Sequence, residues 1–504
     1  MPTNKIKELR KSGKLKEALQ LALNDYEAMP NVPFTAVNLA WVYYDYCKQY
    51  SETGNVEKFQ ETFLRIKELN LLPTNKILND TLCWRFLILL KRISTKYPQE
   101  QQSQITDTCF NLAKALILEK PGDSYTILFK AFYQVRNNWN HYTDFCDWWD
   151  LQNFQSKDYQ CDILENGKKM PISLAEGAYI AYARDLLKEK DKEKIQQFLP
   201  YIQKLNEEHP EMNYPGFFIG KLLLSLGDDH SAINALLPFA RKKRHEFWIW
   251  QLLAQAKEQD KKIHLACLLR AVHCRTKEVF LGKVRQELAN LLIDMQNFKS
   301  AKEQILLIIK NRAESHYKIP YEIQQWTREP WYDDRNAMDN NPIDIDYMAV
   351  TNKLLMEDLP SHTAIVTYIN KEKKIMNIVY GKEKSGFFKY TNQLNNVKIG
   401  DALILFFNEI SDKGYIKPIS IEINKKAISD CDFYRHVTGV IHSNKSHTYF
   451  FLQSNEVKSY IPLNLIQKLN LQSGNTIKAN IIYDQNRKKN QWEWRCLTIE
   501  RTEM

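Results

Sequence analysis

Three aromatic residues near the C-terminus lie among lysines and arginines at a spacing that suits binding of single-stranded nucleic acid. Residues 447–452 alternate as a β-strand does, which places Tyr449 and Phe451 on one face. Tyr460 follows in a second short apolar run, 459–462. Exposed rings of this kind stack on nucleobases, and basic side chains neutralise phosphates. The basic residues expected to contact phosphate are Lys445, Lys458, Arg487, Lys488 and Lys489.

The local charge supports this interpretation. Residues 433–504 carry ten basic and five acidic side chains, so the rings are expected to lie in a positive field. The residues are useful only if strands of a small barrel hold them on one outward face, because period-two alternation places neighbouring side chains on opposite faces. Elements elsewhere in the chain must therefore form the barrel that positions these rings.

Sequence signatures of common catalytic centres are absent. The chain has no G-x-x-x-x-G-K-[ST] phosphate loop, no H-E-x-x-H, no G-x-S-x-G and no H-x-E with a paired C-x-x-C. We therefore expect a protein that is not an enzyme and needs no cofactor or metal. A degenerate nuclease site built from Asp344, Asp346 and Lys353 stays open, because nucleases need only scattered carboxylates and a lysine.

Three polar clusters have both a functional and a structural interpretation. Asp144, Asp147 and Asp150 could contact a metal or a basic peptide, but a solvated acidic stripe is favoured. The basic run 241–245 could bind phosphate, although helix ends collect positive charge for local reasons. Thiolates and imidazoles of a last group could bind a metal, but their spacing matches no zinc site, so they are expected to lie in the core or on the surface. These residues are His264, Cys267, His273 and Cys274.

Length and charge indicate several domains. The chain has 504 residues, 44% hydrophobic and 26% charged, which is globular composition beyond the usual size of one core. Its formal charge of +10 divides into about +7 for residues 1–314, about −4 for 315–357 and about +7 beyond. Nine cysteines without a C-x-x-C pair, the lack of 18 consecutive apolar residues and the lack of a secretory signal predict a cytoplasmic protein with reduced thiols and no membrane partner.

The first two-thirds of the chain repeats with a period near 34. A similar turn between two amphipathic helices recurs at 13–18, 54–59, 227–232 and 296–301. Small residues recur in two sets: Ala183, Gly220, Ala254 and Ala289, spaced 37, 34 and 35 apart, and Ala232, Ala266 and Ala301, spaced 34 and 35 apart. This period predicts stacked antiparallel helix pairs.

The pattern resembles the tetratricopeptide repeat, whose paired helices need small residues at two positions in order to approach closely. Trp250 and Leu253-Ala254 match the family's Trp and Leu-Gly, Gly220 keeps the glycine itself, and Pro30 matches the closing proline. The resemblance implies a superhelix whose groove binds a protein partner. A plain spacer is the alternative.

Two features depart from the repeat. Arg270 and His273 occupy positions that are usually apolar or small, and residues 75–170 keep the helical periodicity but lose the spacing. Between His316 and Asn341 prolines forbid a long helix, and a short helix is expected at 344–357. The expected connector therefore contains aromatic residues that pack on its neighbours.

The remaining chain predicts two similar five-strand units, each with a Gly-Asp or Gly-Asn turn before its fourth strand. Expected strands are 364–369, 375–380, 386–388, 400–403 and 417–423 in the first unit, and 437–441, 448–452, 459–462, 474–477 and 492–499 in the second. This layout resembles the cold-shock type of OB-fold, which stacks bases on strands of K-G-F-G-F-[IV] and V-F-V-H type.

The second unit fits these motifs better than the first. Residues 447–452 and 459–462 fall on the two motifs, with His447 in place of the lysine and Thr448 and Phe450 in place of the glycines. The matching positions of the first unit, which hold one ring, are Met376, Ile378 and Phe387. The first unit is thus better suited to a structural or protein-docking role.

Together these features predict a multidomain protein, with an all-α tetratricopeptide-like superhelix followed by two small all-β OB-like barrels. The expected parts are a repeat domain (1–314), an aromatic, proline-rich acidic connector (315–358), a first OB-like barrel (359–428) and a second, cold-shock-like barrel (429–504). The expected function is a non-catalytic adaptor that holds a protein partner in the repeat groove and single-stranded nucleic acid, RNA favoured, on the second barrel. The arrangement also resembles accessory proteins of bacterial conflict or anti-phage loci. The alternative is a pure protein–protein scaffold within a larger, possibly defence-related, complex.

Overall fold

The computed structural model describes residues 2–333, 344–408, 410–424, 428–446, 448–486 and 489–500. Contacts divide the chain into two compact units, Met1–Phe239 and Ala240–Met504. The boundary between the units falls inside one helix, α12 (Asp229–Lys243). The domain limits at 314, 358 and 428 expected from the sequence stay a prediction.

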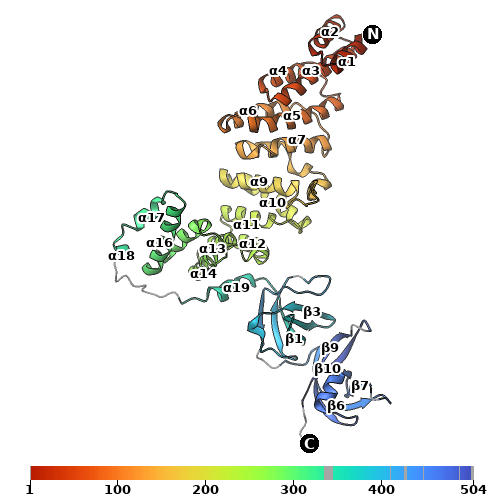
Figure 1. Ribbon diagram of the computed structural model, residues 1–504, viewed down its shortest axis with the longest axis vertical. Coiled ribbons are helices and arrows are strands. Elements are labelled where there is room, and N and C mark those ends of the chain that lie inside the picture. The colour runs from red at the N-terminus through yellow and green to blue at the C-terminus, as the bar shows by residue number, and fades with distance from the viewer. Residues whose placement is uncertain are drawn as a thin grey trace. The chain divides into compact units, whose positions relative to one another are not determined.

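The first unit consists of helices stacked in successive layers (Figure 1). In chain order they are α1 (Pro2–Lys11), α2 (Leu15–Ala28), α3 (Pro33–Thr53), α4 (Val56–Glu68), α5 (Lys76–Lys96), α6 (Gln99–Ala113), α7 (Asp123–Tyr133), α8 (Tyr142–Trp149), α9 (Leu174–Glu189), α10 (Lys192–Glu208), α11 (Pro215–Leu226) and the start of α12. Three short 3₁₀ helices lie between α7 and α9: η1 (Arg136–Asn138), η2 (Leu151–Asn153) and η3 (Ser156–Tyr159).

The turns that repeat in the sequence share one backbone conformation. Gly13, Gly54, Gly227 and Gln296 all have a positive φ, between 59° and 85°. A residue in this left-handed region ends a helix and lets the chain reverse, and glycine adopts it without a Cβ clash. The predicted recurrence of the turn is therefore confirmed, including its one non-glycine member.

The small residues of the repeat lie where helices meet. All six alanines of the two sets are fully buried. Gly220 on α11 is also buried, and a Cβ added there would come within 2.3 Å of Leu236 Cγ on α12. Only a residue without a side chain allows the two helices this approach.

We therefore expect Gly220→Leu and Ala254→Leu each to lower the free energy of unfolding by about 1–3 kcal/mol, since both overfill a tight helix crossing. Thermal melts followed by circular dichroism measure the change. Ala313→Leu is the matched control, because Ala313 is exposed near the end of its helix. Both core variants melting with the parent would show that the proposed repeat register is wrong.

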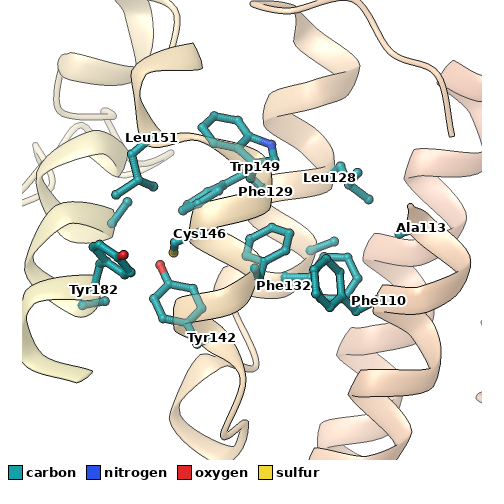
Figure 2. Packing of buried hydrophobic residues seen from close by; sticks show 14 of the residues in the cluster. Phe110, Ala113, Leu128, Phe129, Phe132, Tyr142, Cys146, Trp149, Leu151 and Tyr182 are labelled. Carbon is teal, nitrogen blue, oxygen red and sulfur yellow. The ribbon is translucent and has the colours of Figure 1, made fainter. Parts of the chain in front are cut away.

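Aromatic packing replaces the small-residue spacing in the middle of the first unit. Figure 2 shows Phe129, Phe132 and Trp149 packed in a buried cluster between helices. The Trp149 ring stacks on Tyr125 at 4.6 Å, and its Nε1 donates to the Tyr125 carbonyl at 3.1 Å. Large rings, rather than small residues, therefore fill the helix contacts within residues 75–170, where the helical periodicity continues without the 34-residue spacing.

The second unit begins with further helix pairs. They comprise α13 (Phe247–Ala256), α14 (Lys261–Val272), η4 (Glu278–Leu281), α15 (Gly282–Asp294), α16 (Phe298–Glu314), α17 (Tyr321–Trp326), α18 (Pro330–Asp333) and, after residues outside the described ranges, α19 (Tyr347–Leu355). Ile323, Trp326 and Trp331 of the expected connector pack with Ala289, Ile305 and Ile308. The aromatic residues after His316 are thus part of a helical core.

The two departures from the repeat pattern, Arg270 and His273, are explained by α19. The guanidinium of Arg270 is buried under the Trp250 ring at 4.1 Å and donates to Thr351 Oγ1 at 2.7 Å and Asn352 Oδ1 at 2.8 Å. The His273 ring stacks on Tyr347 at 5.0 Å. Burial lowers the pKa of Arg270 to about 10. Polar residues at these positions fasten α19 to α14.

The remainder of the second unit is β-rich and forms two modules, which confirms the predicted fold class. The first module contains β1 (Ser361–Asn370), β2 (Ile375–Gly381), β3 (Lys384–Lys389), η5 (Asn392–Leu394), β4 (Ala402–Phe406) and β5 (Ser420–Ile423). The second contains β6 (Tyr434–Ser443), β7 (Phe450–Gln453), β8 (Lys458–Ile461), α20 (Leu463–Leu469), β9 (Thr476–Asn486) and β10 (Gln491–Glu500). The second is a closed barrel of order β10-β8-β7-β6-β9.

The first module, expected as an OB-like barrel, differs from the closed second module. Its strands form a five-stranded sheet of order β3-β2-β1-β4-β5. A short parallel bridge links β3 to the segment before β5, through Phe387 N to Gly414 O (2.9 Å) and Ile416 N to Phe387 O (2.8 Å). Pro418 follows, and its lack of a backbone N–H prevents the ladder from continuing.

The two β modules share an apolar interface. Ile365, Val379 and Ala402 from the first module are buried in one cluster with Ile482 and Leu497 of the second. One face of each module is therefore occupied by the other module, and this limits which faces can bind a ligand.

Candidate nucleic-acid interface

Four outward side chains form a row across four strands of the closed barrel. His442 on β6 lies opposite Phe451 on β7, and Phe451 lies opposite Tyr460 on β8. Tyr460 in turn pairs with Arg495 on β10. The strand ladder itself sets this row, because residues directly opposite on neighbouring strands share one face.

The rings of this row, together with Tyr449, form what we call the ring platform: His442, Tyr449, Phe451 and Tyr460. His442 stacks on Phe451 at 5.4 Å between ring centroids, and Tyr449 stacks on Tyr460 at 5.2 Å. Tyr449 is 37% exposed, whereas Phe450 and Leu452 are buried in the barrel core. The predicted alternation of this strand is confirmed, and the structure brings the three predicted rings together.

Local hydrogen bonds hold Tyr449 in place at the start of β7. The Asn444 Oδ1 accepts from Thr448 N at 2.9 Å and from Tyr449 N at 3.0 Å. On β6, a Cβ added to Gly439 would come within 2.4 Å of the Gln453 carbonyl oxygen, so this position requires a glycine. These contacts fix the β6–β7 hairpin that presents the platform.

Two of the predicted basic residues lie over the rings. Lys458 Nζ is 3.8 Å from the Phe451 ring centroid, and Lys489 Nζ is 5.7 Å from that of Tyr449. Lys445 is exposed on the turn that precedes β7. Arg487 and Lys488 lie outside the described residues. An ammonium beside an aromatic face suits a ligand that combines phosphate with stacked bases.

A cavity of about 430 Å³ opens beside the Tyr449–Tyr460 stack. We call it the edge pocket; its lining residues are Tyr449, Tyr460, Asp484, Gln485, Asn486, Lys489, Glu493 and Arg495. Arg495 Nη2 pairs with Asp484 Oδ2 at 2.6 Å, and Lys489 Nζ lies 3.3 Å from Glu493 Oε2. The pocket therefore joins an aromatic wall to a polar wall of two ion pairs.

Sequence reasoning missed His442, Arg495 and Glu493. The signal was present in the alternation of their strands: Ile441, Trp494 and Cys496 pack in the barrel core. Next to these core residues in the chain, His442, Glu493 and Arg495 therefore face outward. Trp494 packs against the core, and its ring is tilted against that of Tyr483, with the centroids 5.5 Å apart.

The first module carries its own aromatic row, which contains one of the three positions that matched the cold-shock motif, Phe387. Met376 and Ile378, which matched the cold-shock motif, are fully buried in the core of the sheet. The match to the motif therefore fails for these two positions on β2, whereas Phe387, the third matching position, lies on the opposite face. The opposite face pairs Tyr368 with Asn377 and Asn377 with Phe387, and the Phe387 ring lies 5.6 Å from Tyr415.

The three aspartates on α8 and directly after it, Asp144, Asp147 and Asp150, have structural partners. Lys194 lies 3.2 Å from Asp144 and 3.0 Å from Asp147, and the Tyr182 hydroxyl donates to Asp147. Asp150 accepts from the Gln152 backbone N–H at 3.1 Å. Across the described ranges, no three His, Cys, Asp or Glu side chains gather closely enough to hold a metal ion.

The other clusters also make internal contacts. Arg241 of the basic run donates through Nε to the Leu355 carbonyl at 2.8 Å and pairs with Asp358. Asp346 of the nuclease-like group caps α19 by accepting from Ala349 N at 3.0 Å. Cys267 is fully buried, and Cys274 Sγ donates to the Arg270 carbonyl at 3.4 Å. These groups therefore have roles in holding the helices.

Comparison with known proteins gives two matches to family models. Residues 356–417 match a model described as S1/CSD-like domain 1 of the TOTE conflict systems. Residues 213–346 match a domain of unknown function, DUF7017. No curated protein matches the chain. The match to the conflict-system domain falls on the first β module, which shows that this part of the chain is S1/CSD-like.

Among solved structures, the TPR2AB-domain:pHSP90-complex of yeast Sti1 is similar at 13% sequence identity. The match covers 57% of this chain and 96% of that chain, with a TM-score of 0.21. Of the helices that the structure describes, none combines the length and the apolar character needed to cross a membrane.

Proposed function

We propose that this protein is a non-catalytic cytoplasmic adaptor that binds single-stranded nucleic acid, with RNA favoured, on its C-terminal barrel and a protein partner along its helical repeats. The proposed binding of nucleic acid rests on the ring platform, where the Lys458 ammonium lies over the Phe451 ring. Every base has a π-face, so stacked rings bind single strands with little dependence on sequence. RNA is favoured because of the cold-shock resemblance of the second barrel.

The proposed binding of a protein partner rests on a polar cavity of about 490 Å³ along α15 and α17. Its lining residues are Lys283, Gln286, Glu287, Asn290, Glu322, Gln325 and Trp326. Glu287 accepts from Gln251 Nε2 on α13 at 2.7 Å, and burial raises the pKa of its carboxyl. Amide side chains on successive helices can pair with the backbone of an extended segment, which suits a peptide from a partner protein.

The proposed setting is a bacterial conflict or anti-phage system. The support is the description of the family model that matches residues 356–417. All nine cysteines are free thiols in the structure, which suits a reducing compartment. An accessory protein of such a system would bring a partner to a nucleic acid without acting on either.

A second candidate function is a pure protein scaffold, and the interface between the β modules favours it. Each module uses one apolar face to bind another protein module, through residues such as Val379 and Leu497. On this alternative the ring platform would also dock a protein.

A filter-binding titration separates the two candidates. We expect the full-length protein to retain single-stranded RNA and single-stranded DNA, with RNA bound more tightly, and to retain duplex more weakly because its bases are already stacked. Added salt should weaken all binding, since phosphates contribute to it. No retention even at low salt would favour the scaffold, and duplex bound as tightly as single strands would argue against stacking of bases on the ring platform.

A further inference from the structure

We propose that the edge pocket is a nucleobase pocket that selects guanine. The inference rests on the proposed binding of single strands, and it adds a base preference to a platform that stacks any base. It is carried by the placement of Glu493 beside the Tyr449–Tyr460 stack, within one cavity of about 430 Å³. Cavities of this size are typical of small-ligand sites.

The charges of the edge pocket suit a base rather than a phosphate. Its two cations, Lys489 and Arg495, are each paired with a carboxylate, Glu493 and Asp484 respectively. The formal charge of this group is therefore zero, and a phosphate would meet two carboxylates at close range. A neutral, polar pocket beside an aromatic wall instead suits a planar heterocycle with hydrogen-bonding edges.

Lys489 locates the carboxylate relative to the stacking ring. Its Nζ lies 5.7 Å from the Tyr449 centroid and 3.3 Å from Glu493 Oε2. A base stacked on Tyr449 would therefore present its edge near Glu493. Each Glu493 oxygen accepts one hydrogen bond, Oε1 from Asn486 Nδ2 at 2.5 Å and Oε2 from Lys489 Nζ at 3.3 Å, and keeps a second lone pair for a base. Asp484 is less available, because its Oδ2 accepts from both Nε and Nη2 of Arg495 and its Oδ1 accepts from Gln485 N.

The chemistry of the carboxylate selects among the four bases. An ionised glutamate accepts hydrogen bonds at both oxygens and donates none. Guanine presents two adjacent donors, N1–H and the N2 amino group, on its Watson–Crick edge. Adenine and cytosine present one exocyclic amine there, and uracil presents a single N–H. A carboxylate facing that edge makes two hydrogen bonds to guanine alone.

The test compares uridine strands of about ten nucleotides, within the site size of one OB-fold, that carry a central U, A, C, G or inosine. Fluorescence anisotropy gives the dissociation constants for the full-length protein. We expect the G strand to bind about tenfold tighter than the U strand, as a two-hydrogen-bond base contact should. Inosine lacks the N2 amino group, so it should lose most of this gain without any change to the protein.

Variants assign the preference to Glu493. Glu493→Gln should abolish the preference, so that the G and U strands bind the variant with equal affinity; the freed Lys489 acts on both strands alike. Glu456→Gln is the matched control, because Glu456 is an exposed carboxylate that pairs with Arg435 outside the pocket, and it should keep the preference. A parent protein that binds all five strands equally overturns the guanine pocket but keeps the proposed function. Binding to none of them overturns both.

Discussion

Replacing Tyr449 and Phe451 together with alanine is expected to weaken the binding of single-stranded RNA at least about tenfold, while the barrel stays folded. Removal of one stacking ring costs about 1–3 kcal/mol per base. Both rings lie on the outer face, whereas the barrel core is built from Phe450, Leu452 and Ile461, which the change leaves in place. Filter binding gives the affinity, and a thermal melt reports whether the barrel remains folded.

The control for this prediction is a matched pair of exposed rings elsewhere. Phe34 and Tyr201 are 48% and 44% exposed on the helical unit, and their double alanine variant should bind RNA like the parent. Alanine at Lys445 and Lys458 should act differently, by reducing the salt dependence of affinity without altering base preference. Unchanged affinity of the folded double-aromatic variant would argue against the platform and for the scaffold alternative.

Replacing Trp149 with alanine is expected to lower the free energy of unfolding by about 3–5 kcal/mol. Trp149 is fully buried, stacks on Tyr125 at 4.6 Å and lies 4.7 Å from both Phe129 and Phe154. The Tyr125 hydroxyl also donates to the Trp149 carbonyl at 2.6 Å. Loss of the indole leaves a cavity among closely packed buried rings, which have little freedom to close it.

Urea unfolding followed by far-ultraviolet circular dichroism measures this loss. Because whole domains are only about 5–15 kcal/mol stable, the change should shift the transition visibly. Trp84→Ala is the control, since Trp84 is 48% exposed on α5 and its loss should cost about 0.5 kcal/mol or less. Equal transitions for the two tryptophan variants would show that the aromatic cluster does not hold the middle of the helical unit.

The repeats were predictable because their signal is local. The positive-φ turn at Gly227 and the close helix approach at Gly220 each favour a glycine at one position. Small residues and turns of this kind recur with the repeat. The same holds for the second barrel, where five strands occur in the predicted order and Phe450 and Leu452 face the core. Local periodicity alone is enough to place such residues on a face.

Register and long-range partners were not predictable in this way. In the first module Met376 and Ile378 matched motif positions that hold exposed rings in the family, although both lie in the core. Arg270 departed from the repeat pattern in the sequence, but its partners Thr351 and Asn352 are about eighty residues away and left no local trace.

The sequence by itself determined the helical array, the order of the strands and the three rings Tyr449, Phe451 and Tyr460, since each follows from the period of its own segment. Only the tertiary structure decided that His442 and Arg495 complete the row, that Lys489 lies beside Glu493, and that the two β modules bury a face of each other. The physical reason is that a period places a side chain on a face, whereas strand pairing and module packing bring together residues that are distant in the chain.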